Sequence, residues 1–215
     1  MKKAIFLLTT LLCLASYSHG MADDGSDQTA TKLLNEALGS MRKVVSYHAK
    51  ADLTIDGQKI DNRRKAHIEG DFGAHGGAYT VVGFDGKQTK IIVIGSDTYT
   101  TSDGGETWYR NVNRDVAMLS QMVTGPVDPS LKLINQGAVR ITGTEDVDGT
   151  SATRLLIAAK SPVDVWVADE PRVGRVIRKI RLIIASDEGI DFDTTIIYSD
   201  FDKRLDIQAP TINTR

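Results

Sequence analysis

The stretch SYHAKADLTI, residues 46–55, alternates apolar and polar side chains. Successive side chains of a β-strand point to opposite faces of the sheet, so a period of two predicts a strand with one apolar face and one hydrated face. Tyr47 and Leu53 lie on the apolar phase, whereas His48 and Lys50 lie on the polar phase. The stretch therefore predicts an antiparallel sheet that covers a core on one side.

The same alternation returns along most of the chain. Turn signals such as Asp85-Gly86, Gly95-Ser96 and Asp103-Gly104 separate the strands. Further strands are expected over residues 65–72, 79–83, 90–94, 98–101, 136–144, 152–159, 163–168, 176–185 and 190–199. Together with residues 46–55, these segments predict a meander of about ten antiparallel strands.

Two segments have helical periodicity instead. Within residues 27–45, apolar side chains such as Leu34, Leu38 and Met41 recur on one side, and Ser26 or Asp27 provides the N-cap. Residues 114–137 also have helical spacing and interrupt the strands. The expected fold is α+β: a curved antiparallel sheet, a half-barrel, covered by an N-terminal helix and by a mid-chain helical insertion.

Residues 1–20 have the three parts of a signal peptide: the basic pair Lys2 and Lys3, a short apolar core and a polar end. The apolar core is shorter than the roughly 20 residues that a bilayer-spanning helix needs. Small residues allow cleavage before Met21 or before Asp23. We therefore expect residues 1–20 to be a signal peptide and residues 21–215 to form a single domain that is periplasmic or secreted.

Composition excludes several classes of protein. The 26 basic and 28 acidic residues give a net charge of −2, without the basic excess of a nucleic-acid-binding protein. The single cysteine, Cys13, has no partner for an intramolecular disulfide. It follows Leu12, whereas a lipoprotein signal has a small residue at that position. We do not expect a lipid anchor at Cys13.

Catalytic motifs are absent from the sequence after the signal peptide. His48, His67 and His75 are the available imidazole bases, and none accompanies a nucleophile elbow or an HExxH pair. His67, Glu69 and Asp71 share one strand face, so with His75 they offer a possible metal site. A hydrated strand face with alternating charges produces the same sequence pattern without binding a metal. We expect no enzyme, no metal and no cofactor.

Residues 101–108, TSDGGETW, fit the Asp-box pattern that repeats in sialidase-like propellers. A propeller needs one copy per blade, and this chain has one copy. Asp103 can accept hydrogen bonds from turn amides, and Trp108 can pack on the sheet. We expect a β-hairpin turn here and no glycosidase activity.

A curved sheet that its helices do not fill would leave an apolar cavity, which suits an acyl chain. Arg178 is polar on the apolar phase of its strand, so it is either a contact for a lipid head group or an arginine at a frayed strand start. The predicted cavity lining consists of apolar residues on the inner phase of the strands and on the helical cover: Tyr47, Leu53, Ile68, Phe72, Ile92, Ile94, Leu119, Met122, Ile180, Leu182, Ile196 and Tyr198.

Several segments carry a resemblance to a known family: residues 46–53, residues 70–72, the pair of segments 97–100 and 107–109, and the closing segments 198–201 and 207–210. In their order and spacing they look like the LppX/LprAFG lipoproteins, which share the fold of the lipoprotein carrier LolA and its receptor LolB. The resemblance implies a hydrophobic cavity that holds lipid or an acylated lipoprotein, without catalysis. Family members usually begin with a lipidated cysteine, and the lack of a convincing site here favours the soluble mode of LolA.

The expected function is therefore that of an exported carrier for lipid or acylated lipoprotein within the cell envelope. Its partners would be the acyl chains and a membrane-bound donor or acceptor protein, and we expect a monomer. The alternative is a non-catalytic structural or interaction module of the envelope with a filled core.

Overall fold

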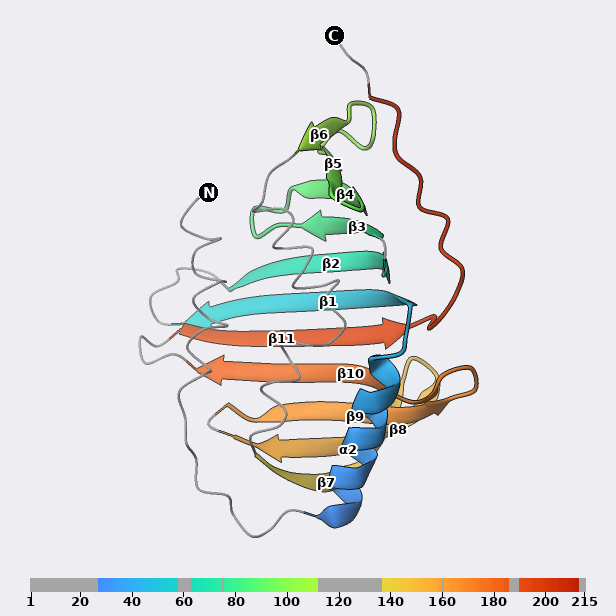
Figure 1. Cartoon of the computed structure of the whole chain (residues 1–215). Helices are drawn as coiled ribbons and strands as arrows, with labels where there is room; N and C mark the ends of the chain where they lie inside the picture. The colour runs from blue at the N-terminus through green and yellow to red at the C-terminus, as the bar shows by residue number, and fades with distance from the viewer. Residues whose placement is uncertain are drawn as a thin grey trace.

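The computed structural model describes residues 27–57, 63–74, 76–111, 137–159, 161–185 and 190–212 (Figure 1). Within them, one helix accompanies a single open sheet of eleven strands, all paired antiparallel. The elements are α2 (Gln28–Met41), β1 (Ser46–Gly57), β2 (Arg64–Gly73), β3 (Gly76–Val82), β4 (Gln88–Ile94), β5 (Asp97–Thr101), β6 (Tyr109–Asn111), β7 (Ala138–Val147), β8 (Thr150–Ala158), β9 (Val163–Glu170), β10 (Gly174–Ala185) and β11 (Ile190–Ser199). The curved antiparallel sheet is confirmed.

The strand order is β6-β5-β4-β3-β2-β1-β11-β10-β9-β8-β7. Strands that follow one another in sequence lie side by side, except β6 and β7, which form the two edges of the sheet. The first and last strands pair at its centre. Their register sets Ala49 opposite Tyr198, and the β1–β2 register sets Tyr47 opposite Phe72. The chain thus builds one half of the sheet with β1 to β6 and the other half with β7 to β11.

The helix α2 begins where the sequence predicts. Asp27 is the N-cap, and its carboxylate accepts a hydrogen bond from the backbone N–H of Thr29 at 2.8 Å. Buried residues of α2 face the sheet: Ala30, Leu34, Ala37, Leu38 and Met41. Figure 1 shows α2 crossing the part of the sheet built from β7 to β10, and its contacts with the sheet are mainly with β10, β7 and β9.

The end of α2 and the strand β6 differ from the sequence-based expectation. The helix ends at Met41 rather than near Val45, because the backbone of Val45 bonds elsewhere: its N–H donates to Asp202 Oδ1 at 2.7 Å and its carbonyl accepts from Ala74. The strand β6 was not predicted as a separate strand, since three residues are too short to show a period. The predicted helical insertion, residues 114–137, lies outside the described residues except for its last residue, as does the predicted signal peptide.

The main core lies on the sheet face that α2 covers, which we call the inner face. It joins the buried side of α2 to residues from both halves of the sheet, including Phe72, Leu155, Val165 and Ile177. A smaller buried cluster forms around Trp166, with Val147, Ala152 and Ala168. In the part of the chain that the structure describes, no helix is long and apolar enough to cross a membrane.

Candidate functional site

An aromatic row crosses the inner face over β11, β1, β2 and β3. Tyr47 stacks on Phe72 with ring centroids 5.6 Å apart, and Tyr198 meets Tyr47 edge-on at 5.6 Å. The ring of Tyr79 continues the row at 5.2 Å from Phe72. Burial raises the pKa of both Tyr47 and Tyr198 above the ordinary tyrosine value. The row is therefore a neutral, largely apolar band across four adjacent strands.

Glycines opposite these rings make the row possible. Gly70 pairs with Tyr79, and a Cβ at Gly70 would collide with the backbone and Cβ of Tyr79. Gly77 pairs with Phe72, and a Cβ there would lie 3.3 Å from Phe72 Cδ1. Gly70 thus allows the close approach of the Tyr79 backbone, and Gly77 leaves space for the ring of Phe72.

The structure brings most of the predicted wall residues together. Tyr47, Phe72, Ile180 and Tyr198 belong to the main core and are at most 5% exposed. Ile68, Leu182 and Ile196 are half-buried and pack against it. Leu53 is half-buried on the same phase of β1 as Tyr47. Leu119 and Met122, predicted for the cover, lie outside the described residues.

The structure places Ile92 and Ile94 on the opposite phase of β4 from the main core. Ile91 is 5% exposed within the core, and Val93 packs against it, so the side chains at 92 and 94 point to the other face. Residues 91–94 are four consecutive apolar residues, so the sequence carries no alternation that would identify the inward pair. Ile91 and Val93 are inner-face residues that the sequence-based prediction missed.

Other inner-face residues were also missed. Tyr79 extends the aromatic row, and the strand pattern of residues 79–83 could have indicated it. Phe201 is 2% exposed although it follows the last strand. No periodicity continues past Ser199, so no local signal marked Phe201 as a core residue.

Arg178 lies in the interior of β10, not at a frayed strand start. The β10–β9 register shifts between Ile177 and Lys179, which makes Arg178 the extra residue of a β-bulge. Its side chain is 8% exposed, and its nearest acidic partner is Glu170, with Nη1 to Oε2 at 3.5 Å. Its guanidinium carbon lies 5.8 Å from the ring centroid of Phe201. The structure therefore places this cation next to the core.

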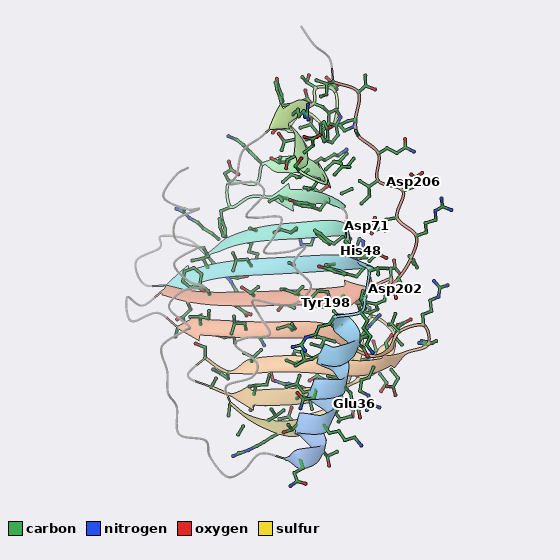
Figure 2. The ribbon with its side chains drawn as sticks, viewed as in Figure 1. Glu36, His48, Asp71, Tyr198, Asp202 and Asp206 are labelled. Carbon is green, nitrogen blue, oxygen red and sulfur yellow. The ribbon has the colours of Figure 1, made fainter. Side chains whose placement is uncertain are left out.

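The histidines lie on the other face of the sheet, which we call the outer face. His48 Nδ1 pairs with Asp71 Oδ1 at 2.8 Å, and Figure 2 shows these two side chains side by side. His67 Nδ1 pairs with Asp52 Oδ1 at 2.8 Å. Between them Lys50 Nζ lies 3.2 Å from Glu69 Oε1. These three cross-strand pairs form an ionic ladder on the outer face of β1 and β2.

The ladder accounts for the metal-like spacing in the sequence. Its carboxylates are each paired with a histidine or a lysine across the strands. Within the described residues, no group of three or more His, Cys, Asp and Glu side chains has the arrangement of a metal site. His75 lies outside these residues.

The Asp-box segment forms a turn between β5 and β6. Asp103 Oδ1 accepts hydrogen bonds from Thr101 Oγ1 at 2.5 Å and from the backbone N–H of Thr107 at 3.0 Å. These bonds lower the pKa of Asp103, with the Thr101 hydroxyl as the largest cause. Each of these bonds stays within the turn, in agreement with the predicted hairpin role.

Two hollows lie away from the predicted wall. A wide one of about 780 Å³ lies along the hydrophilic side of α2, where its described lining is Gln28, Thr31, Lys32, Asn35 and Glu36. A smaller one of about 100 Å³ lies between α2 and the sheet and includes Leu33, Val167 and Arg175 in its lining. None of the described wall residues lines either of these two hollows.

Two solved structures match this fold over nearly their whole length. The lipoprotein LppX of Mycobacterium tuberculosis superposes with a TM-score of 0.57 at 17% identity, covering 85% of this chain and 100% of LppX. LprF of Mycobacterium bovis superposes with a TM-score of 0.59 at 11% identity, covering 86% of this chain and 98% of LprF. No protein-family model matches the chain, and no curated protein matches it in sequence. The chain therefore has the fold of the LppX and LprF proteins.

Proposed function

We propose that this protein is an exported carrier that binds lipid or the acyl chains of a lipoprotein on the inner face of its sheet. The observation that supports it best is the continuous apolar surface from β10 to β4, in which the aromatic row is flanked by half-buried aliphatic side chains. These are Ile68, Val81, Val93, Leu182 and Ile196. Their partial exposure leaves apolar area that a ligand can cover.

Burial of an acyl chain on this surface would supply the driving force for binding. Each methylene group contributes about 0.8 kcal/mol, so a chain of about 15 methylene groups gains about 12 kcal/mol. Association costs on the order of 4–15 kcal/mol in lost freedom of motion, so the net gain lies between about 8 kcal/mol and none. The binding needs no catalytic group. The proposed location is the periplasm or the secreted space, with a membrane-bound donor or acceptor as partner and a monomer as the working state.

The second candidate is an envelope module with a filled core. It is favoured by the tight packing of Tyr47, Phe72 and Tyr198, each at most 5% exposed. Mass spectrometry of organic extracts from protein purified out of its native envelope distinguishes the two candidates. Co-purified lipid supports the carrier, whereas absence of lipid together with no binding of a fluorescent fatty acid contradicts it.

Adjacent residues on β10 provide a matched pair of variants. Leu182 packs against the main core on the inner face, whereas Ile183 is 41% exposed on the outer face. Leu182→Asp is expected to weaken fatty-acid binding at least tenfold, and Ile183→Asp is expected to leave binding unchanged. Circular dichroism and Tm measurements establish that each variant folds. If Leu182→Asp unfolds, Ile196→Trp tests the same surface by filling it, with the same loss expected.

A further inference from the structure

The guanidinium group of Arg178 is nearly buried and incompletely paired. Its side chain is 8% exposed, and its Nε is buried without a hydrogen-bond partner. Its ion pair with Glu170 is long, at 3.5 Å. A buried donor that lacks an acceptor costs free energy, and a buried charge costs more unless it is closely paired. The site would therefore gain from an additional acceptor.

The surroundings of Arg178 connect it to the apolar inner face. Ile177, which precedes it in the bulge, and Phe201, under its guanidinium group, both belong to the main core. Figure 2 shows Tyr198 near the end of β11, and the pairing of Lys179 with Ile197 sets the neighbouring Arg178 close to that end of the strand. A cation at this place can meet the polar end of a ligand whose apolar part lies on the aromatic row.

Glu170 is well placed to give way to such a ligand. It is the last residue of β9, next to the turn that leads to β10, and its side chain is 26% exposed. A carboxylate at the rim of the protein can turn into solvent at small cost, because its charge is then hydrated. The charge of Arg178 also lowers the pKa of Asp200, but Lys203 is the main cause of that shift. Glu170 is thus the group that an incoming anion would replace.

We propose that Arg178 recognises the anionic group of the lipid, a carboxylate or a phosphate, and that Glu170 occupies its place in the unloaded protein. This inference rests on the proposed function and narrows its ligands to anionic ones. An arginine fork can bind two oxygens of a carboxylate or phosphate at once, which makes it selective for such groups. A neutral lipid offers no anion to the guanidinium group, which would then keep its 3.5 Å contact with Glu170.

The test compares ligands that share their acyl chains but carry either an anionic or a neutral polar group. Oleate and oleyl alcohol compete with a fluorescent fatty acid for the full-length mature protein, and phosphatidylglycerol and diacylglycerol of the same acyl chains form a second pair. The wild type is expected to prefer the anionic member of at least one pair by tenfold or more. The pair that shows the preference identifies the source of the anion as a fatty acid or as a phospholipid.

Variants connect this preference to Arg178. Arg178→Met should abolish the preference while oleyl alcohol binding stays within threefold of wild type, and Glu170→Gln should tighten oleate binding. Arg181→Met is the matched control, because Arg181 lies on the same strand but pairs with Asp193 on the outer face at 2.8 Å. If Arg178→Met does not fold, Arg178→Lys keeps the charge without the planar fork and should reduce the preference in part.

Several outcomes would overturn the inference. Equal binding of charged and neutral ligands by the wild type overturns it but leaves the proposed function intact. An unchanged preference in Arg178→Met does the same. Displacement of oleate by inorganic phosphate that is equally strong in the wild type and in Arg178→Met places the anion site elsewhere, which also contradicts it. If the wild type binds none of the four lipids, the proposed function itself fails.

Discussion

Protonation of His67 is coupled to folding through its cross-strand contact with Asp52. Its hydrogen bond to Asp52 is the largest cause of its raised pKa, and Glu69 adds to the effect. The pKa of Glu69 is lowered in turn, first by Lys50 and then by His67. The ionic ladder therefore stabilises the folded state most between the ordinary pKa values of the two groups, 4.5 for Glu69 and 6.5 for His67.

The sign of the effect follows from the direction of each shift. A raised pKa means that folding favours protonated His67, so this contribution is present below pH 6.5 and is lost as the pH rises through the folded-state pKa. We expect His67→Gln to lower the Tm at pH 5.5 and to leave it near wild type at pH 8. The loss should be at most about 1 kcal/mol, as for other exposed ion pairs. Asp52→Asn should remove the same pH dependence, and equal losses at both pH values would contradict this origin.

At the residue scale, the sequence predicts which face a side chain occupies wherever apolar and polar residues alternate. Tyr47 is correctly placed because the polar residues Ser46 and His48 flank it, and Tyr198 because it continues the phase of Phe192, which Asp191 and Asp193 flank. Ile92 and Ile94 are misplaced because every residue from 91 to 94 is apolar. The burial of Arg178 depends on a bulge in the β10–β9 ladder, which no local pattern indicates.

The stability of the helix α2 depends on its N-cap and on its packing against the sheet. Helices of 14 residues are marginal in isolation, so α2 relies on the cap and on its buried side. We expect Asp27→Ala to cost about 1 kcal/mol in the free energy of unfolding, because the N–H of Thr29 loses its acceptor. Gln28→Ala, at the exposed neighbouring position, is the control and should change little. Urea denaturation measures both, and equal effects would contradict a capping role.

At the element scale, the strands and the helix were predictable because each repeats its period over several residues. Short or interrupted elements were not predictable from the sequence. The strand β6 has three residues, and β1 continues through Asp56 and Gly57, which look like a turn in sequence but pair with Asp191 and Ile190. Pairing with β11 supplies backbone partners that outweigh the local turn preference.

The two halves of the sheet, β1 to β6 and β7 to β11, are joined by the pairing of β1 with β11. The segment after β11 reinforces this pair: Phe201 enters the core, the Asp202 N–H donates to the Ser46 carbonyl at 2.8 Å, and Ser46 Oγ donates to the carbonyl of Lys203 at 2.6 Å. Figure 2 shows Asp202 at the end of β11 and Asp206 farther along the same segment. Residues 200–203 thus fasten the last strand to the first.

Two truncations test this fastening. A chain that stops after Ser199 loses the burial of Phe201 and the contacts of Asp202, so we expect a loss on the order of 3–5 kcal/mol in the free energy of unfolding. A chain that stops after Lys203 keeps both and should stay within about 1 kcal/mol of wild type. Chemical denaturation monitored by tryptophan fluorescence measures the difference. Equal stability of the two truncated chains would contradict the role assigned to residues 200–203.

At the scale of the whole molecule, the meander was predictable and the central pairing was not. Alternation indicates strands and short turns indicate neighbours along the chain, so β1 to β6 and β7 to β11 follow as two hairpin series. The pairing of β1 with β11 joins residues about 140 positions apart, such as Ala51 and Ile196. No local signal encodes such a contact.

This central pairing has a consequence for how the chain is made. Synthesis proceeds from the N-terminus, so the strand at the middle of the sheet is the last to become available. Until then β1 and β10 each present an unpaired edge of 12 residues. Such edges invite pairing with other chains. The unfinished polypeptide is therefore most prone to aggregation just before its final strand emerges, and a chaperone that shields strand edges would help it most at that stage.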